Sequence, residues 1–340
     1  MELWKPATVL FVLVAAFLLL QTRQEGAQPA SGPAALTTAT ATPPQTSAPY
    51  LENGTVISAC PAVLDESKTF TLGDNLRANS SCITISANGA VLDCGGRSIS
   101  GEGRGSGVYL DDVSNVTIRN CVIRRFHTGI YVSSGGHNTF INNILEENAE
   151  DGLKLTSGSN FNTMVGNIAR RNNYTGIVVY AGRDNVASGN IADDNARYGI
   201  FFDSHSSGGA MRGNRAENNG EVNLYLTTSS NITIEGNIVS GGVRGIQLDA
   251  SDGNVIRGNS ISGAIYGISL YASSGNGVFN NTVIGGLRGI QLYADSRNNT
   301  VGGNAVRGSS DSGIYMEGSG NIVENNTLDG NDRDFVCSGC

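Results

Sequence analysis

A short phrase recurs at a nearly constant interval along most of this 340-residue chain. Residues 242–261 read GVRGIQLDASDGNVIRGNSI, and residues 286–306 read GLRGIQLYADSRNNTVGGNAV, 44 residues later. The glycine of the Gly-Ile-x-Leu phrase or a close variant falls at 107, 129, 152, 176, 199, 245, 267, 289 and 313. Asn223 takes its place in one repeat, and we expect Asp334 to do so in the last. A period in the twenties is typical of solenoids, whose repeats pack only on their neighbours.

Asparagine recurs with the same period in two columns. The first column comprises residues 120, 143, 167, 190, 214, 237, 259, 281, 304 and 326. The second comprises residues 115, 138, 162, 185, 231, 254, 276, 299 and 321, with Gly209 as its one interruption. A residue at the same corner of successive coils lies about 4.8 Å above its counterpart, so stacked amides can hydrogen-bond along the axis. Asparagine also tolerates the left-handed backbone of a sharp corner.

Each repeat holds three short segments in which apolar and polar residues alternate. Examples are residues 255–257, 259–261 and 267–270, and such alternation predicts strands. The 46 glycines disfavour helices but suit short strands joined by tight turns. The sequence therefore predicts an all-β fold, a single three-sheet parallel β-helix of about ten to eleven coils.

Three phrases near the start of the repeats carry a family resemblance. They are Cys60…Cys82-Ile-Thr-Ile, Val91-Leu-Asp-Cys-Gly-Gly96 and Asn115-Val-Thr-Ile-Arg-Asn-Cys121. With the repeats, they resemble the right-handed parallel β-helix proteins of the pectin-lyase-like superfamily. The likeness is strongest to the carbohydrate-binding and sugar-hydrolase group and to the periplasmic copper-accessory protein of nitrous oxide reductase. It spans about residues 57–336 and implies a right-handed coil, but such motifs indicate architecture far more than activity.

The ends of the chain differ in composition from the repeats. Residues 7–20 form an apolar run without charge, shorter than the roughly 20 residues of a spanning helix. We expect residues 1–23 to be a signal peptide or an N-terminal membrane anchor, the only membrane contact expected of the chain. Residues 24–50, rich in Ala, Thr and Pro, predict a linker. The remaining predicted regions are an N-terminal cap (51–86), the β-helix (87–336) and a Cys-x-x-Cys tail (337–340), all extracytoplasmic: at the cell surface, in the periplasm or secreted.

The six cysteines are consistent with an oxidising compartment. Six cysteines allow fifteen pairings, and the sequence does not choose among them. We expect a Cys60–Cys82 disulfide that fastens the cap. Cys94 and Cys121 occupy nearly matching places on adjacent coils, where they either pair or stack. For Cys337 and Cys340 we expect a capping disulfide, because a zinc site needs two further ligands.

Charge narrows the range of partners. The net charge is −8, with only three lysines and scattered arginines. Nucleic acid is therefore not expected as a partner, since phosphate binding needs clustered basic residues.

In the Gly-Ile-x-Leu-x phrase, the two x positions should face outward. Aromatic and acidic residues recur at these positions along the coils, and rings with interleaved carboxylates suit the apolar faces and hydroxyls of sugars. We therefore predict that a polysaccharide or other glycan binds a tyrosine strip made of Tyr109, Tyr131, Tyr180, Phe201, Asp203, Tyr225, Asp249, Tyr271, Tyr293, Tyr315 and Glu317. The strip as a whole favours binding without catalysis.

Two other interpretations of the strip remain open. Tyrosine and threonine favour strands, so the strip could be a neutral decoration of an exposed sheet. Tyrosine is also enriched at protein interfaces, which would make the chain a structural or protein-interaction solenoid of the cell surface with a surface-protein partner.

One segment suggests catalysis. Tyr198-Gly-Ile-Phe-Phe-Asp203-Ser-His205 is similar to the Tyr-Gly-x-Asp-Pro-His phrase of β-helix uronan epimerases, whose polar residues move the proton. Two additional residues separate Tyr198 from Asp203, and serine replaces the proline. Asp203, His205 and Tyr198 are therefore weak catalytic candidates for a polysaccharide epimerase, lyase or glycosidase.

The sequence predicts no metal site or cofactor. Sites for soft metals need clustered His, Met or Cys, whereas these residues are dispersed, at His127, His137, His205, Met164, Met211 and Met316. Ca²⁺ in the Asn- and Asp-rich turns stays open, although the glycine-rich repeat of calcium-binding β-rolls is missing.

Overall fold

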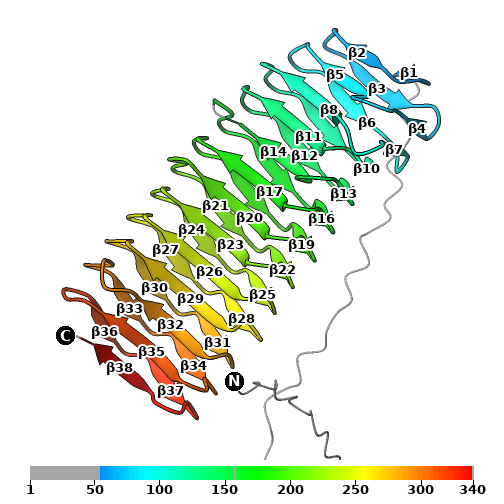
Figure 1. The fold of residues 1–340 in the computed structure, drawn as a ribbon. Coiled ribbons are helices and arrows are strands. Elements are labelled where there is room, and N and C mark those ends of the chain that lie inside the picture. Colours follow the sequence, from blue (N-terminus) through cyan, green and yellow to red (C-terminus); the bar gives the residue numbers. More distant parts are fainter. Residues whose placement is uncertain (1–53, 157, 339–340) are drawn as a thin grey trace, which may run out of the picture. The chain divides into compact units, whose positions relative to one another are not determined.

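The computed structural model describes residues 54–156 and 158–338. Within these ranges every regular element is a β-strand, and the strands form three parallel sheets (Figure 1). Each coil contributes one strand to each sheet in turn, so that the strand order within a sheet advances by three. No helix in the described ranges is long and apolar enough to cross a membrane. The predicted all-β, three-sheet parallel β-helix is confirmed.

Sheet A contains 13 strands: β1 (Thr55–Ile57), β3 (Thr69–Leu72), β6 (Val91–Asp93), β9 (Thr117–Arg119), β12 (Thr139–Ile141), β15 (Thr163–Val165), β18 (Val186–Ser188), β21 (Ala210–Arg212), β24 (Thr233–Glu235), β27 (Val255–Arg257), β30 (Gly277–Phe279), β33 (Thr300–Gly302) and β36 (Ile322–Glu324). Sheet C contains 12: β4 (Leu76–Arg77), β7 (Ser98–Ser100), β10 (Val122–Arg124), β13 (Ile144–Glu146), β16 (Ile168–Arg170), β19 (Ile191–Asp193), β22 (Arg215–Glu217), β25 (Ile238–Ser240), β28 (Ser260–Ser262), β31 (Thr282–Ile284), β34 (Ala305–Arg307) and β37 (Thr327–Asp329).

Sheet B contains 13 strands and includes the repeated Gly-Ile-x-Leu phrases: β2 (Ala62–Leu64), β5 (Ile83–Ile85), β8 (Ser106–Asp111), β11 (Thr128–Ser133), β14 (Leu153–Leu155), β17 (Thr175–Tyr180), β20 (Tyr198–Asp203), β23 (Val222–Thr227), β26 (Arg244–Asp249), β29 (Tyr266–Tyr271), β32 (Arg288–Leu292), β35 (Ser312–Glu317) and β38 (Phe335–Ser338). The coil count slightly exceeds the expected ten to eleven because the residues assigned to a cap already pair as strands, β1 with β3 and β2 with β5.

The core is a stack of aliphatic side chains inside the coil. In sheet B, Ile246, Ile268 and Ile290 lie in register on adjacent strands, and all three are fully buried. Each such side chain stabilises the fold by about 1.5–3 kcal/mol relative to an exposed one. Glycine precedes each of these isoleucines because a Cβ on Gly267 would come within 2.4 Å of the carbonyl oxygen of Gly289 on the next coil.

Buried asparagines form ladders along the axis. The Nδ2 group of each asparagine donates to Oδ1 of the next at 2.8–3.0 Å, in the order Asn143, Asn167, Asn190, Asn214, Asn237, Asn259, Asn281, Asn304 and Asn326. Nδ2 of Asn190 also donates to the main-chain oxygen of Met164. These buried amides avoid the cost of desolvation because each has partners above and below.

The predicted columns are off by one residue at three positions. Asn120 lies beside its column, where the main-chain N–H of Cys121 donates to Asn143 instead. In the second column Val116 and Ile232 take the expected places of Asn115 and Asn231 and donate to Asn138 and Asn254. The three displaced asparagines have φ angles of 55–60° at the preceding turn position. Sequence analysis also missed a third, shorter ladder, which comprises Asn148, Asn172, Asn195, Asn219 and Asn223.

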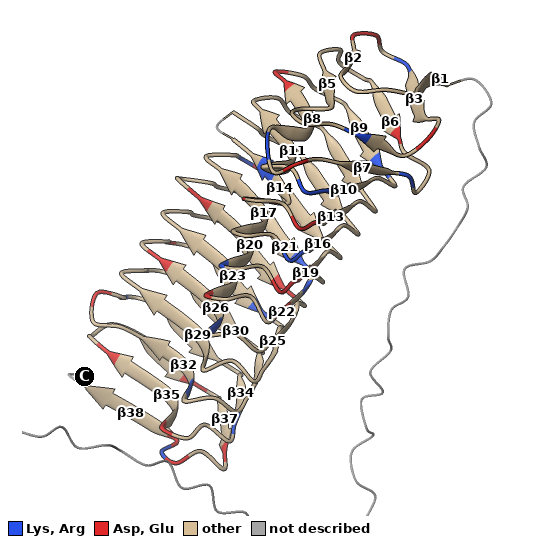
Figure 2. Cartoon of the chain, turned by 45° about the vertical axis from the view of Figure 1, so that its right-hand side comes forward, with Lys and Arg blue, Asp and Glu red and all other residues tan. Residues whose placement is uncertain are grey.

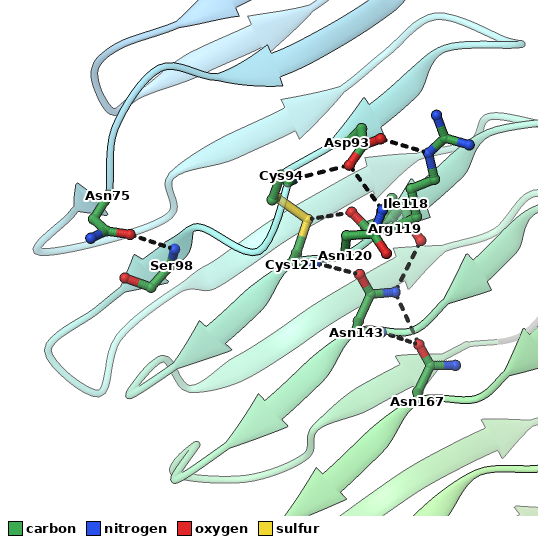
Figure 3. The surroundings of a disulfide bond; sticks show 11 residues. Asn75, Asp93, Cys94, Ser98, Ile118, Arg119, Asn120, Cys121, Asn143 and Asn167 are labelled. Carbon is green, nitrogen blue, oxygen red and sulfur yellow. Dashed lines mark hydrogen bonds and ion pairs between the residues drawn. A yellow bond between two sulfur atoms is a disulfide. The ribbon is translucent and has the colours of Figure 1, made fainter. Parts of the chain in front are cut away.

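Two disulfides lie in the first coils. Cys60 pairs with Cys82, as expected, and Cys94 pairs with Cys121, which resolves the alternative between pairing and stacking. The second bond lies directly above the first asparagine ladder (Figure 3). Cys337 is also disulfide-bonded and belongs to β38. Cys340, the predicted signal or anchor segment (1–23) and the predicted linker (24–50) lie outside the described residues.

Candidate functional site

The tyrosine strip lies on the outer face of sheet B, where its members occupy matching positions on adjacent strands. Tyr109 lies beside Tyr131, and Phe201 lies beside Tyr225. Their ring centroids are 5.6 Å and 4.8 Å apart, respectively. Tyr271 and Tyr293 stack still more closely, at 4.1 Å. The strip is therefore a series of stacked aromatic runs along the solenoid axis.

Several side chains that point outward on this face are nevertheless buried. Phe201 is 5% exposed, and Val178, Ser269 and Gln291 at equivalent outward positions are fully buried. The spacing between coils of about 4.8 Å is smaller than an aromatic side chain, so large residues cover the smaller ones beside them. These x positions therefore lie on the outer side of the sheet but are covered by neighbouring side chains.

An aromatic cluster occupies the middle of the face. It contains Tyr174, Val178, Tyr180, Tyr198, Phe201, Val222 and Tyr225, and it is separate from the main core. The ring of Tyr198 lies 4.8 Å from that of Phe201 and 5.1 Å from that of Tyr225. These rings therefore form a second apolar cluster on the outside of the coil, and their packing against one another holds them in place without a ligand.

Three arginines near the start of the sheet B strands pack on tyrosines of the outer face and were not predicted from the sequence. Arg197 lies 4.9 Å from the Tyr174 ring centroid and 5.0 Å from that of Tyr198. Two coils further on, Arg244 lies 5.6 Å from the ring centroid of Tyr266. Arg288 lies 3.6 Å from the ring centroid of Tyr315. Arg244 and Arg288 lie in register with Tyr198, directly before the glycine, whereas Arg197 lies one residue earlier.

Most carboxylates of the strip already accept hydrogen bonds from tyrosine. Tyr225 Oη donates to Asp249 at 2.5 Å, and Tyr315 Oη donates to Glu317 at 2.6 Å. Burial and the bond to Asp249 raise the pKa of the Tyr225 hydroxyl well above its usual range. Burial likewise raises the pKa of Tyr180 to about 12. The hydroxyls are therefore protonated at neutral pH and act as hydrogen-bond donors rather than as bases.

A buried ion pair borders the aromatic cluster at β14. Lys154 Nζ lies 3.2 Å from Asp151 Oδ2, 3.0 Å from Glu150 Oε2 and 5.6 Å from the ring centroid of Tyr180. Asp151 is fully buried. Burial raises the pKa of Asp151 to about 6, although Lys154 opposes the shift. Burial would lower the pKa of Lys154, but Asp151 and Glu150 raise it, so Lys154 is a fixed positive charge.

The weak catalytic candidates do not form one constellation. Asp203 is half-buried, and its Oδ1 accepts the main-chain N–H of Ser204 at 2.5 Å. His205 is exposed in the following turn, at a φ of 69°. Among the described residues, no hydrogen bond or ion pair joins His205 to Asp203 or Tyr198. Counting from Tyr198, the acid of the uronan-epimerase phrase would fall at Phe201, which is buried in the aromatic cluster.

No three His, Cys, Asp or Glu side chains come together as metal ligands would in residues 54–156 and 158–338. The copper-type ligands named from the sequence remain dispersed along the coils, and the oxygen-rich turns show no Asp or Glu cluster of that size.

Solved structures similar to this chain share its fold at low identity. The Azotobacter vinelandii mannuronan C-5 epimerase AlgE6 A-module has a TM-score of 0.71 and 18% identity, with 80% of this chain and 87% of that chain covered. The Dettilon tailspike protein gp208 has a TM-score of 0.56 and 15% identity, with 79% and 60% covered. DFA-IIIase from Arthrobacter chlorophenolicus A6, in complex with GF2, has a TM-score of 0.55 and 12% identity, with 75% and 83% covered. At these identities the likeness shows the fold alone.

Comparisons of the sequence give the family. No curated protein matches the chain. The family described as periplasmic copper-binding protein (NosD) matches residues 194–339. The family described as right handed beta helix region matches residues 72–215 and 106–253, which together make up more than half of the chain. The chain therefore belongs to the right-handed β-helix family.

Proposed function

We propose that the outer face of sheet B binds a polysaccharide that runs along the solenoid axis, outside the cytoplasm and without catalysis. The observation that carries this proposal is the stacking of aromatic rings on successive coils, with hydroxyl and carboxylate groups between the rings. Apolar sugar faces pack on such rings while sugar hydroxyls exchange hydrogen bonds with the polar groups.

The rigidity of the face supports binding. The aromatic cluster is already packed, and Arg197 and Lys154 hold Tyr174 and Tyr180 from the side. A ligand therefore orders few side chains when it binds, which removes part of the usual entropic cost of association.

The compared proteins support the class of ligand and the location. The AlgE6 A-module acts, by its name, on mannuronan, a polysaccharide that would run along a face of a similar fold. The family match at residues 194–339 is to a periplasmic protein, and the two described disulfides suit an oxidising compartment. These observations favour a glycan ligand and an extracytoplasmic location for this chain.

The arrangement of acidic groups favours binding over catalysis. General acid–base chemistry needs a proton donor and acceptor at defined places around one bond. Here Phe201 stands where the uronan-epimerase phrase has its acid, and His205 is exposed in the turn after β20. The hydroxyl of Tyr225 is committed to Asp249.

A glycan array with the purified protein tests this proposal. The Tyr271→Ala/Tyr293→Ala double variant should lose array binding, because it removes one stacked run and leaves the coil core intact. Phe161→Ala is the matched control: Phe161 is 49% exposed and lies at a turn, where it stacks on His137. Absence of binding by the unmodified protein, or equal loss in the Phe161→Ala variant, would contradict the proposal.

A polysaccharide-modifying enzyme is the second candidate. It is favoured by the place of Asp203, which lies in register with Tyr180 on the adjacent strand of the outer face. Depolymerisation and epimerisation assays, with Asp203→Asn and His205→Ala as controls, separate the two functions. Turnover that disappears in both variants would establish catalysis and replace the binding function.

A further inference from the structure

A groove of about 610 Å³ lies in the first coils, away from the tyrosine strip. It is formed where the sheet C strands β4, β7 and β10 end and the chain turns toward β5, β8 and β11, together with the residues directly before β2. Arg77, Ser100, Glu102, Arg124 and Arg125 line one part of it, and Cys60, Pro61, Ala78, Asn79 and Ser81 line the other. A volume of this size accommodates a small ligand such as one or two sugar residues.

The groove has an excess of positive charge. Arg77, Arg124 and Arg125 face Glu102 as the only carboxylate in the lining. Arg77 is exposed and has no ion pair with any described residue. Arg125 Nε pairs with Glu147 at 3.1 Å, but this pair is largely exposed.

Further arginines lie close to the residues that line the groove. Glu146 is 7% exposed and is shared by three guanidinium groups: those of Arg170 at 2.8 Å, Arg171 at 3.1 Å and, more weakly, Arg124 at 3.9 Å. The chain as a whole carries a net charge of −8. This local concentration of arginine, visible beside β7 and β10 in Figure 2, therefore runs against the overall charge.

The groove also holds neutral polar groups in fixed positions. Ser100 Oγ accepts from Arg124 Nε at 3.2 Å, which orients the guanidinium, and Ser81 Oγ accepts the N–H of Ser106 at 3.1 Å. The Cys60–Cys82 disulfide ties one wall to the next coil. Asn79 and Glu102 complete the lining with groups that can bind hydroxyls.

We propose that this groove binds an acidic sugar residue. The guanidinium groups of Arg77, Arg124 and Arg125 hold its carboxylate or sulfate, because a guanidinium group can donate paired hydrogen bonds to two oxygens of either anion. Asn79 and Glu102 bind its hydroxyls. The site is separate from the outer face of sheet B and goes beyond the proposed polysaccharide binding there.

Ligand-observed NMR titration of the purified protein tests the site, with glucuronate, glucose 6-sulfate, glucose and inorganic sulfate as probes. Glucuronate or glucose 6-sulfate should bind at least tenfold more tightly than glucose, since only the acidic sugars pair with arginine. Either acidic sugar supports the site, and their ratio identifies the preferred anion. Glucose binding as tightly as both, or inorganic sulfate binding as tightly as the better sugar, would overturn the proposal.

Variants locate the binding. Arg77→Ala and Arg125→Ala should each weaken acidic-sugar binding about tenfold, the effect of losing one charge-assisted hydrogen bond. Arg297→Ala is the matched control, because Arg297 is also exposed without an ion pair but lies far along the chain. Unchanged affinity in both groove variants overturns the site. The Tyr271→Ala/Tyr293→Ala variant should keep the acidic-sugar affinity, so failure of the strip and failure of the groove are distinguishable.

Discussion

Tyr271 and Tyr293 lie on adjacent coils with their ring centroids 4.1 Å apart and their planes inclined by 15°. Tyr293 Oη donates to Gln291 Oε1 at 3.3 Å, so the hydroxyl is held at the side of the stack. The pair therefore presents one continuous apolar surface with a polar margin.

The first prediction separates the ring from the hydroxyl. Tyr293→Phe should reduce glycan affinity no more than about threefold, since the stacked surface survives, whereas Tyr293→Ala should reduce it about tenfold or more. Titration calorimetry with the best array ligand measures both. Equal losses in the two variants would show that the hydroxyl, not the ring, carries the binding.

The second prediction concerns the asparagine ladder. Asn190→Ala should lower the free energy of unfolding by about 3 kcal/mol or more, because it removes the side-chain bonds to Asn214 and Met164. It also removes the acceptor of the Asn167 main-chain N–H and one of the two acceptors of Asn167 Nδ2. Urea unfolding followed by circular dichroism provides the value. Asn173→Ala is the control, since Asn173 is exposed beside the ladder and should change stability by less than about 0.5 kcal/mol.

The third prediction is a pH dependence. Burial raises the pKa of Asp151 from 3.8 to about 6, so the folded state binds this proton more tightly than the unfolded state does. Stability from this group is fully present below pH 3.8 and is lost as the pH rises through about 6. Asp193 shifts in the same direction for the same reason.

Asp151→Asn should therefore flatten the fall in unfolding free energy between pH 4 and pH 6, by about 3 kcal/mol at most. Chemical denaturation at several pH values measures the slope. Asp203→Asn serves as the control, because Asp203 lies on the same face but is only half-buried. An unchanged slope in the Asp151→Asn variant would mean that the carboxylate is solvated in the native protein.

The fourth prediction concerns the Cys94–Cys121 disulfide, which joins residues 27 apart in sequence. Cys94→Ala with Cys121→Ala should lower the free energy of unfolding by about 2–4 kcal/mol, because the unfolded chain regains the freedom of the closed loop. Thermal unfolding of the variant, compared with the unmodified protein under oxidising conditions, measures the loss. A melting temperature equal to that of the unmodified protein would assign the stability of this region to the ladder below the bond.

The architecture was predictable because one residue pattern recurs in every coil. The exact residue that enters the ladder at each corner was harder to predict. Asparagine often occurs twice in succession, as in Asn142-Asn143 and Asn280-Asn281, where the first residue has a φ of 52° or 53° and the second enters the ladder. Asn120 occupies only the turn position, and the next residue, Cys121, contacts the ladder through its main-chain N–H. The sequence pattern alone therefore assigns Asn120 to the ladder wrongly.

The sequence predicted which side chains of the tyrosine strip point outward but not how much of each is exposed. Alternation indicates which way Phe201 points, but its burial also depends on Tyr225, which lies one coil further along the chain. Arg244 and Arg288 were not predicted because most repeats have another residue before the glycine, such as Thr175 or Ser312. The groove was not predicted either, since its lining comes from four successive coils that share no repeated phrase there.

The first asparagine ladder has one polarity: Nδ2 of each asparagine donates to Oδ1 of the asparagine on the following coil and to a main-chain oxygen of the preceding coil. Each coil in the ladder therefore presents to the following coil the same hydrogen-bonding groups that the preceding coil presents to it. Excision of residues 245–266 would bring Arg244 next to Gly267 and rejoin two equivalent corners. The number of coils, and with it the length of the proposed binding face, can thus change by whole repeats while the residues of the core stay the same.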